Sequence, residues 1–241
     1  MEFSAILLGA MAIAGIGGLI RGATGFGGAM VMSPTLSMLI GPIPAVASAL
    51  LLETFVAFSM LPNAARTAHW RTIGPICAAA CVTAPLGGYL LMTLDPGLMR
   101  RAIAATVLLF GLLLLTGLRY RGQQRLGTSL ALGATSGVLV GATSVGAPPV
   151  IVYLLASSDP PAVTRANLTL FVTIISLAAL VVMLWRGMLN GAIALEALQL
   201  SPLYFGGVWL GSRLYGRIDD SAMRRWTLVF LVVVSGIVLA L

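Results

Sequence analysis

The chain has 241 residues, of which 59% are hydrophobic and only 9% are charged. A soluble domain carries roughly 25% charged residues, so the composition excludes an ordinary soluble protein and indicates a polytopic membrane protein. The formal charge of +7 arises because 14 basic residues, all arginine, face seven acids. These arginines stand singly or in short clusters between apolar runs, so we attribute them to orientation in the membrane and not to nucleic-acid binding.

Five apolar segments follow one another in each half of the chain. They cover residues 3–21, 25–40, 43–62, 72–93 and 98–118, and then 126–142, 145–157, 162–185, 188–213 and 222–241. The charge-free stretches 22–52 and 126–158 would each measure roughly 50 Å as one helix, well beyond a hydrocarbon core of roughly 30 Å. Both contain glycine and proline, which break helices. We therefore predict broken helices there, which are tolerated at membrane depth only when buried in protein or lining a watery cavity.

The two halves match in sequence as well as in hydropathy. The triplet GAT at Gly22 recurs at Gly141, Ala45-Val46 recurs at Ala162-Val163, and LMRR at Leu98 recurs as AMRR at Ala222. A glycine cluster precedes each Met-Arg-Arg: Gly87 and Gly88 in the first half, then Gly206, Gly207 and Gly211. The pattern indicates an internal duplication, with repeats over residues 1–118 and 126–241 joined by a cytoplasmic linker, RYRGQQR, over residues 119–125.

The arginines indicate how the repeats are oriented. With five crossings per half and the amino terminus outside, 11 arginines face the cytoplasm and three face out, whereas four crossings per half give 8 against 6 at best. The excess of positive charge on the cytoplasmic side favours the odd count. The predicted fold is thus an all-α polytopic protein of the cytoplasmic (inner) membrane. Its two homologous halves form inverted-topology repeats whose short, broken glycine-rich helices meet at a central cavity.

The glycine-rich stretches GATGFGGAMVMSP, residues 22–34, and GATSVGAPPVIVY, residues 141–153, are the candidate site. A helix that begins inside the membrane exposes unpaired backbone amides with a partial positive charge, and such an end attracts anions. The alternative is close helix packing through small residues. The predicted substrate-binding residues here are Thr24, Gly25, Gly27 and Gly28 in the first half, with Thr143, Ser144 and Gly146 in the second, where Pro148 and Pro149 suit a first helical turn.

These stretches, together with RANLTLFVTII after Pro161, resemble the TauE/SafE family of sulfite exporters and related permeases. The resemblance covers essentially the whole chain and implies a multi-pass carrier of small anions or organosulfur compounds, with sulfite, sulfonates, sulfoacetate and thiosulfate among the proposed substrates. Two features depart from that pattern. Ala147-Pro148-Pro149 stands where a third glycine is common, and the family is usually described with eight spans.

Four polar residues beside the apolar runs complete the predicted site. Arg165 begins a span, followed by Asn167, and its planar guanidinium suits sulfonate or carboxylate oxygens; the alternative is a cytoplasmic anchor that snorkels to the headgroups. Glu53 interrupts the apolar run LLLETFVAF, which predicts a proton-coupling site or a protonated glutamate bonded to a neighbouring helix. Arg21, at the lip of the first glycine stretch, is the second candidate for coupling.

The predicted function is secondary active transport of a small anion by alternating access, coupled to protons through Glu53. The rival predictions are a membrane thiol oxidoreductase that uses Cys77 and Cys81, one helical turn apart, and a passive anion channel. No cofactor or metal site is expected, since no dinucleotide or Walker motif occurs and His69 has no cluster of ligands around it. The expected partners are the anion, protons and the lipid bilayer, not nucleic acid, and a homodimer stays an open alternative.

Overall fold

The computed structural model describes residues 2–117, 125–157, 159–214 and 220–240. Ten helices and no strand occur within these residues, as the prediction of an all-α chain requires. The predicted linker lies outside them except for Arg125. The helices are α1 (Glu2–Thr24), α2 (Gly28–Leu39), α3 (Pro42–Thr67), α4 (Trp70–Thr93), α5 (Pro96–Leu115), α6 (Leu126–Thr143), α7 (Ala147–Leu154), α8 (Pro161–Trp185), α9 (Gly191–Leu214) and α10 (Asp220–Ala240).

Seven of the helices described here are long and apolar enough to cross a membrane: α1, α3, α4, α5, α6, α8 and α9. Large apolar side chains on their outer surfaces are exposed, for example Val82 on α4 at 79% and Trp185 on α8 at 81%. Water would penalise so much exposed apolar surface, whereas lipid does not. The chain is therefore a multi-pass membrane protein.

The two predicted breaks are present, but the helices that follow them are short. At about 1.5 Å per residue, α2 measures about 18 Å and α7 about 12 Å, less than the hydrocarbon core. Neither helix spans the core on its own, because Gly41 with φ of 88° and Pro42 end α2 early, and Pro160 and Pro161 follow α7. The count of five crossings per half stays a prediction. Gly17 lies against Met32, and Gly9 against Leu39, so α2 folds back along α1.

Helices from opposite halves pack against each other through glycine. Gly15 lies against Leu203 and Gly22 against Val208, so α1 and α9 run in the same direction. Helices α6 and α4 also run in the same direction, because Gly133 lies against Ile76 and Gly141 against Ala84. Helices α3 and α8 pack together, as do α5 and α10. In the predicted repeats, α1 corresponds to α6 and α9 corresponds to α4, so the α1–α9 contact is equivalent to the α6–α4 contact. The α3–α8 and α5–α10 contacts each join a helix to its own equivalent in the other half.

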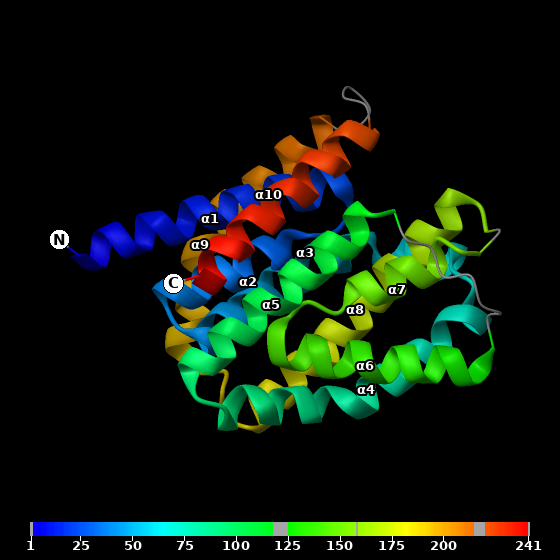
Figure 1. The fold of residues 1–241 in the computed structure, drawn as a ribbon, viewed down its shortest axis with the longest axis horizontal. Coiled ribbons are helices and arrows are strands. Elements are labelled where there is room, and N and C mark those ends of the chain that lie inside the picture. The colour runs from blue at the N-terminus through cyan, green and yellow to red at the C-terminus, as the bar shows by residue number, and fades with distance from the viewer. Residues whose placement is uncertain (1, 118–124, 158, 215–219, 241) are drawn as a thin grey trace.

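The arrangement gives the molecule two ends, which lie to the left and right of Figure 1. Helix α1 begins and α10 ends on the left, while α3 and α9 end on the right. We call the right-hand side the arginine-rich end, because several described arginines lie near helix ends there, among them Arg66, Arg71, Arg125, Arg165 and Arg213. The opposite end carries Arg100, Arg101 and Arg186.

Candidate functional site

The threonine of each GAT triplet makes the same two hydrogen bonds at a helix end, and the Thr24 hydroxyl also lies 2.5 Å from the Phe26 carbonyl oxygen. The Thr24 hydroxyl donates to the carbonyl of Ile20 at 2.8 Å and accepts from the Phe26 amide at 3.4 Å. The Thr143 hydroxyl donates to the carbonyl of Leu139 at 2.7 Å and accepts from the Val145 amide at 3.2 Å. In each case the next residue turns the chain into the left-handed region, with φ of 79° at Gly25 and 59° at Ser144. Both threonine hydroxyl hydrogens are therefore used to stop a helix.

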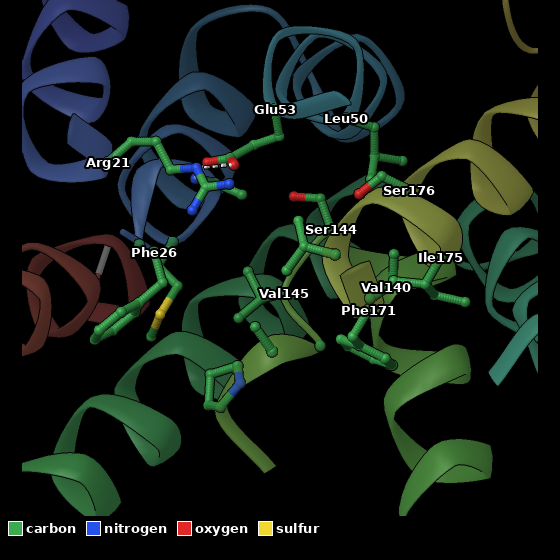
Figure 2. A pocket seen from close by; sticks show the side chains of 17 residues that line it. Arg21, Phe26, Leu50, Glu53, Val140, Ser144, Val145, Phe171, Ile175 and Ser176 are labelled. Atoms are coloured by element: carbon green, nitrogen blue, oxygen red, sulfur yellow. Dashed lines mark hydrogen bonds and ion pairs between the residues drawn. The ribbon is translucent and has the colours of Figure 1, made fainter. Parts of the chain in front are cut away.

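The two breaks face each other across one pocket (Figure 2). Its volume is about 40 Å³, and a single water needs about 10–15 Å³, so it suits a ligand of a few non-hydrogen atoms. Equivalent positions of the two repeats line it in pairs: Phe26 with Val145, and Gly27 with Gly146. Helices α3 and α8 complete the wall with Leu50, Glu53, Phe171, Val172, Ile175 and Ser176.

Arg21 on α1 and Glu53 on α3 form an ion pair at one side of the pocket, which Figure 2 shows as a dashed line. The Arg21 Nε atom lies 2.7 Å from Glu53 Oε2, and the two side chains are only 4% and 7% exposed. Glu53 Oε1 also accepts a hydrogen bond of 3.0 Å from the backbone amide of Ala29, in the first turn of α2. The amide end of α2 thus already holds an anion, the carboxylate of Glu53.

Arg21 lines the pocket and keeps an unused donor. Its Nη2 atom is buried and has no hydrogen-bond partner among the described residues. The hydroxyl of Ser144 also faces the pocket, where it shares a hydrogen bond with Ser33 of α2. Burial of an unsatisfied guanidinium nitrogen is costly. The free donor is therefore the strongest sign that this pocket accepts a ligand with anionic oxygens.

Tyr204 on α9 lies near the same ion pair but does not line the pocket. Its side chain is fully buried, and its hydroxyl interacts with both Glu53 and Arg21. The hydroxyl makes no hydrogen bond of standard geometry within the described part of the chain. Glu53 is therefore surrounded by one cation, one backbone amide and one phenol, contributed by three different helices.

The second amide end offers few donors. Two residues in the first turn of α7, Pro148 and Pro149, have no N–H group, and the pocket wall there is formed by Val145, Ala147 and Pro148. The expectation of two amide ends directed at one anion therefore does not match the structure. One end is occupied by Glu53 and the other is largely without amide hydrogens, so positive charge in the pocket comes from Arg21.

Of the predicted site residues, the structure brings Arg21, Gly27, Glu53, Ser144 and Gly146 to the pocket. The other predicted residues do not line it: Thr24, Gly25, Gly28, Thr143, Arg165 and Asn167.

Arg165 and Asn167 lie near the arginine-rich end instead. Arg165 is exposed, and its guanidinium lies against Gly25. The Asn167 Oδ1 atom accepts from the His69 amide at 2.8 Å, and His69 Nδ1 lies 3.1 Å from Asp159 Oδ1. Asn167 thus fixes the turn between α3 and α4 onto the start of α8.

Sequence reasoning did not find Ser33, Ser176 or Tyr204 as residues of the site. Ser176 could have been found, because Thr169, Thr173 and Ser176 place buried hydroxyls on one face of α8, three or four residues apart. Ser33 lies inside the first glycine-rich stretch, little more than one turn after α2 begins at Gly28. Tyr204 has no comparable signal, since only the packing of α9 on α1 brings it to Glu53.

Comparison with known proteins shows the family of the chain. The family model described as "Sulfite exporter TauE/SafE" matches residues 10–238. A protein of Cupriavidus necator named "Probable sulfite/organosulfonate exporter TauE" is 27% identical over 227 residues, which cover 91% of this chain and 88% of that protein. No solved structure matches. Because the family match spans nearly the whole chain, including both breaks and the pocket between them, the chain belongs to the TauE/SafE family of membrane exporters, which are transporters and not enzymes.

Proposed function

We propose that the chain is a secondary carrier that moves a small sulfur oxyanion or organosulfonate across the cytoplasmic membrane by alternating access. The observation that carries the proposal is the unpartnered Nη2 of Arg21, buried in a pocket between the two helix breaks. A guanidinium recognises sulfonate or sulfite oxygens through parallel N–H donors. The relative named as a sulfite/organosulfonate exporter supports this class of substrate.

The polar groups of the pocket would replace part of the anion's hydration. Arg21 supplies charge, while the hydroxyls of Ser144 and Ser176 supply short polar contacts. The opposite wall, with Val140, Phe171 and Ile175, is apolar. An apolar wall keeps water out and strengthens the electrostatic attraction between the guanidinium and the anion.

The repeats would move against each other about this pocket. Two observations support inverted repeats. The α1–α9 contact is equivalent to the α6–α4 contact, and the end of α3 lies beside the start of its equivalent, α8. In such carriers the binding site lies at the interface of the repeats, and rocking of one part against the other exposes it to either side. Gly27 and Gly146, which lie at equivalent positions in the two breaks, would mark that interface.

Counterflow in proteoliposomes tests the proposal. Vesicles are loaded with unlabelled sulfite or methanesulfonate, diluted into labelled anion, and followed for transient accumulation. A carrier gives this overshoot because it exchanges bound ligands, whereas a channel does not. We expect overshoot for at least one of the two anions and none for acetate. Arg21→Gln should abolish it, while Arg66→Gln, which changes an exposed arginine outside the pocket, should keep it.

Two results would contradict the proposal. Absence of overshoot with both sulfur anions would exclude carriage of this substrate class, and equal overshoot in Arg21→Gln and Arg66→Gln would exclude the pocket. The variant Arg165→Gln belongs in the same experiment. If Arg165→Gln lost the overshoot as completely as Arg21→Gln does, Arg165 would belong to the binding site as the sequence predicted.

The family does not support the rival prediction of a membrane thiol oxidoreductase, and the same vesicles test it. Cys77 and Cys81 are both free, lie on α4, and do not line the pocket. Replacement of both by serine should leave counterflow intact if the chain is a carrier. A membrane oxidoreductase would instead lose its thiol-dependent activity with this change.

A further inference from the structure

Glu53 occupies the place at which a bound anion would be expected. Its carboxylate takes the Nε side of Arg21 and the amide of Ala29 at the positive end of α2. Gly28 leaves room for it, because a side chain at that position would collide with Glu53 Oε1. The Arg21 guanidinium, the Ala29 amide and the space beside Gly28 thus form a binding site for one carboxylate. The arrangement is one that an external oxyanion would also satisfy.

The charges around Glu53 are few. Arg21 faces it from α1 and Tyr204 from α9, while α2 contributes only the Ala29 amide. Helix α8 lines the pocket with Phe171, Val172, Ile175 and Ser176 and adds no ionisable group. Within the described residues that line the pocket, the charges are one guanidinium and one carboxylate. The empty site is therefore neutral as long as the ion pair is intact.

We propose that Glu53 is a tethered substitute for the substrate anion, and that one proton exchanges it for one monovalent anion on Arg21. The inference rests on the proposed function. A proton from the aqueous phase binds a Glu53 carboxylate oxygen, and the neutral acid releases Arg21. The anion then binds the Nε and Nη2 donors. On the other side the anion leaves, the proton returns to water, and the ion pair reforms.

Electrostatics makes this exchange a coupling mechanism. The empty site contains Arg21 and ionised Glu53, and the loaded site contains Arg21, the anion and protonated Glu53, so both are neutral. The two uncoupled forms each carry one uncompensated charge: protonated Glu53 without the anion, or the anion beside ionised Glu53. A lone charge costs several kcal/mol in a membrane interior. Only the neutral forms would move readily between the two sides, which gives one proton per anion and no net charge transfer.

The experiment measures which gradient drives accumulation. Proteoliposomes carrying the unmodified protein receive the anion that passed the counterflow assay, methanesulfonate or hydrogensulfite, the monovalent form of sulfite. One set has an acidic exterior with the membrane potential clamped to zero, and another has equal pH and an imposed potential of either sign. We expect accumulation against a gradient in the first set and none in the second. Accumulation driven by potential alone, or no response to the pH gradient, would overturn the proposal without any variant.

Two glutamate variants then locate the proton. Glu53→Gln should still give counterflow, at an altered rate, but should lose accumulation driven by the pH gradient. The matched control is Glu196→Gln, which changes a glutamate on α9 that does not line the pocket, and it should keep that accumulation. Accumulation by Glu53→Gln at the unmodified level would overturn the assignment. If that variant does not fold, Glu53→Asp, which keeps a titratable group, should respond to the pH gradient. Failure of counterflow in the unmodified protein would instead contradict the proposed function.

Discussion

At the scale of single residues, the site depends on the ion pair between Arg21 and Glu53, and removal of either side chain would destabilise the protein. Arg21 and Glu53 are both almost fully buried. Removal of one partner of a buried pair strands the other charge in a medium of low dielectric constant. The pair therefore stabilises the α1–α2–α3 region only as a pair, and it holds Arg21 in position beside the pocket.

A double-mutant cycle tests this dependence. Arg21→Gln and Glu53→Gln should each lower the free energy of unfolding, by up to about 3–5 kcal/mol for removal of one buried partner. The double variant should lose less than the sum, because no charge is then left unpaired. Thermal unfolding in detergent measures the shift, with Glu196→Gln as a control. Additive losses would mean that the two side chains do not interact.

Ser144 carries a second prediction, because it is the one residue other than glycine with positive φ in the described chain. A side chain in the left-handed region costs roughly 1–2 kcal/mol, and here Ser144 offsets that cost with the hydrogen bond to Ser33. Ser144→Ala loses the bond and keeps the strain, whereas Ser144→Gly loses both. We expect the glycine variant to be more stable than the alanine variant by about 1 kcal/mol. Equal melting temperatures for the two would show that the backbone at this position is unstrained.

The sequence could indicate some of these residues but not their partners. Arg21 and Glu53 stand out as charges beside or within apolar runs, which is how both were predicted to take part in coupling. Their contact depends on α2 folding back along α1, and local patterns do not show that fold. Thr24 and Thr143 illustrate the opposite case. Their place in the glycine stretches predicted that the hydroxyls bind a ligand. In the structure the hydroxyls donate to backbone carbonyls one turn earlier in the same helix.

At the scale of elements, the glycines have two different tasks. Gly25 and Gly27 adopt φ of 79° and 93°, which side chains rarely reach, so they are needed for the break itself. Gly146 has no positive φ, but a side chain there would collide with Val140 and with the carbonyl of Ser136. Leucine at Gly27 or Gly146 would therefore disrupt the fold as well as the pocket. Arg21→Gln is the sharper probe of binding.

The glycine clusters that the sequence showed before each Met-Arg-Arg are contact points between helices of opposite halves. A side chain at Gly207 would collide with the Gly15 carbonyl on α1, whereas nothing lies within 4 Å of a side chain at Gly206. Gly207→Ala should destabilise the protein by about 1–3 kcal/mol through overpacking. Gly206→Ala, its neighbour on the same helix, should be neutral or raise stability by roughly 0.5–1 kcal/mol. Melting temperatures in detergent compare the two, and a loss in Gly206→Ala equal to that in Gly207→Ala would contradict this packing.

At the scale of the whole molecule, equivalent positions of the two predicted repeats line one pocket but differ in chemistry. The position equivalent to Arg21 is Val140, and the position equivalent to Ala29, whose amide binds Glu53, is Pro148. All four line the pocket. The first repeat therefore keeps the charge and the amide donor, and the second supplies the apolar wall. Sequence comparison of the halves shows this difference, but only the fold reveals that the paired positions face one cavity.

The predicted duplication allows a test of how the two repeats are oriented in the membrane. If the repeats are inverted, equivalent helices end on opposite sides of the membrane. Exposed positions at four helix ends allow this test: Thr67 on α3, Thr93 on α4, Trp185 on α8 and Ser212 on α9. With Cys77 and Cys81 replaced by serine, single cysteines at these positions can be labelled with a maleimide that does not cross membranes.

We expect Thr93→Cys and Trp185→Cys to react in intact cells, and Thr67→Cys and Ser212→Cys to react only after permeabilisation. The reason is that the arginine-rich end, to which Thr67 and Ser212 belong, should face the cytoplasm. Helix α3 would then end inside and its equivalent α8 outside, while α4 would end outside and its equivalent α9 inside. Parallel repeats would instead give the α3 and α8 ends the same reactivity. That result would remove the structural basis for alternating access about a pocket between inverted halves, whatever the transport assays showed.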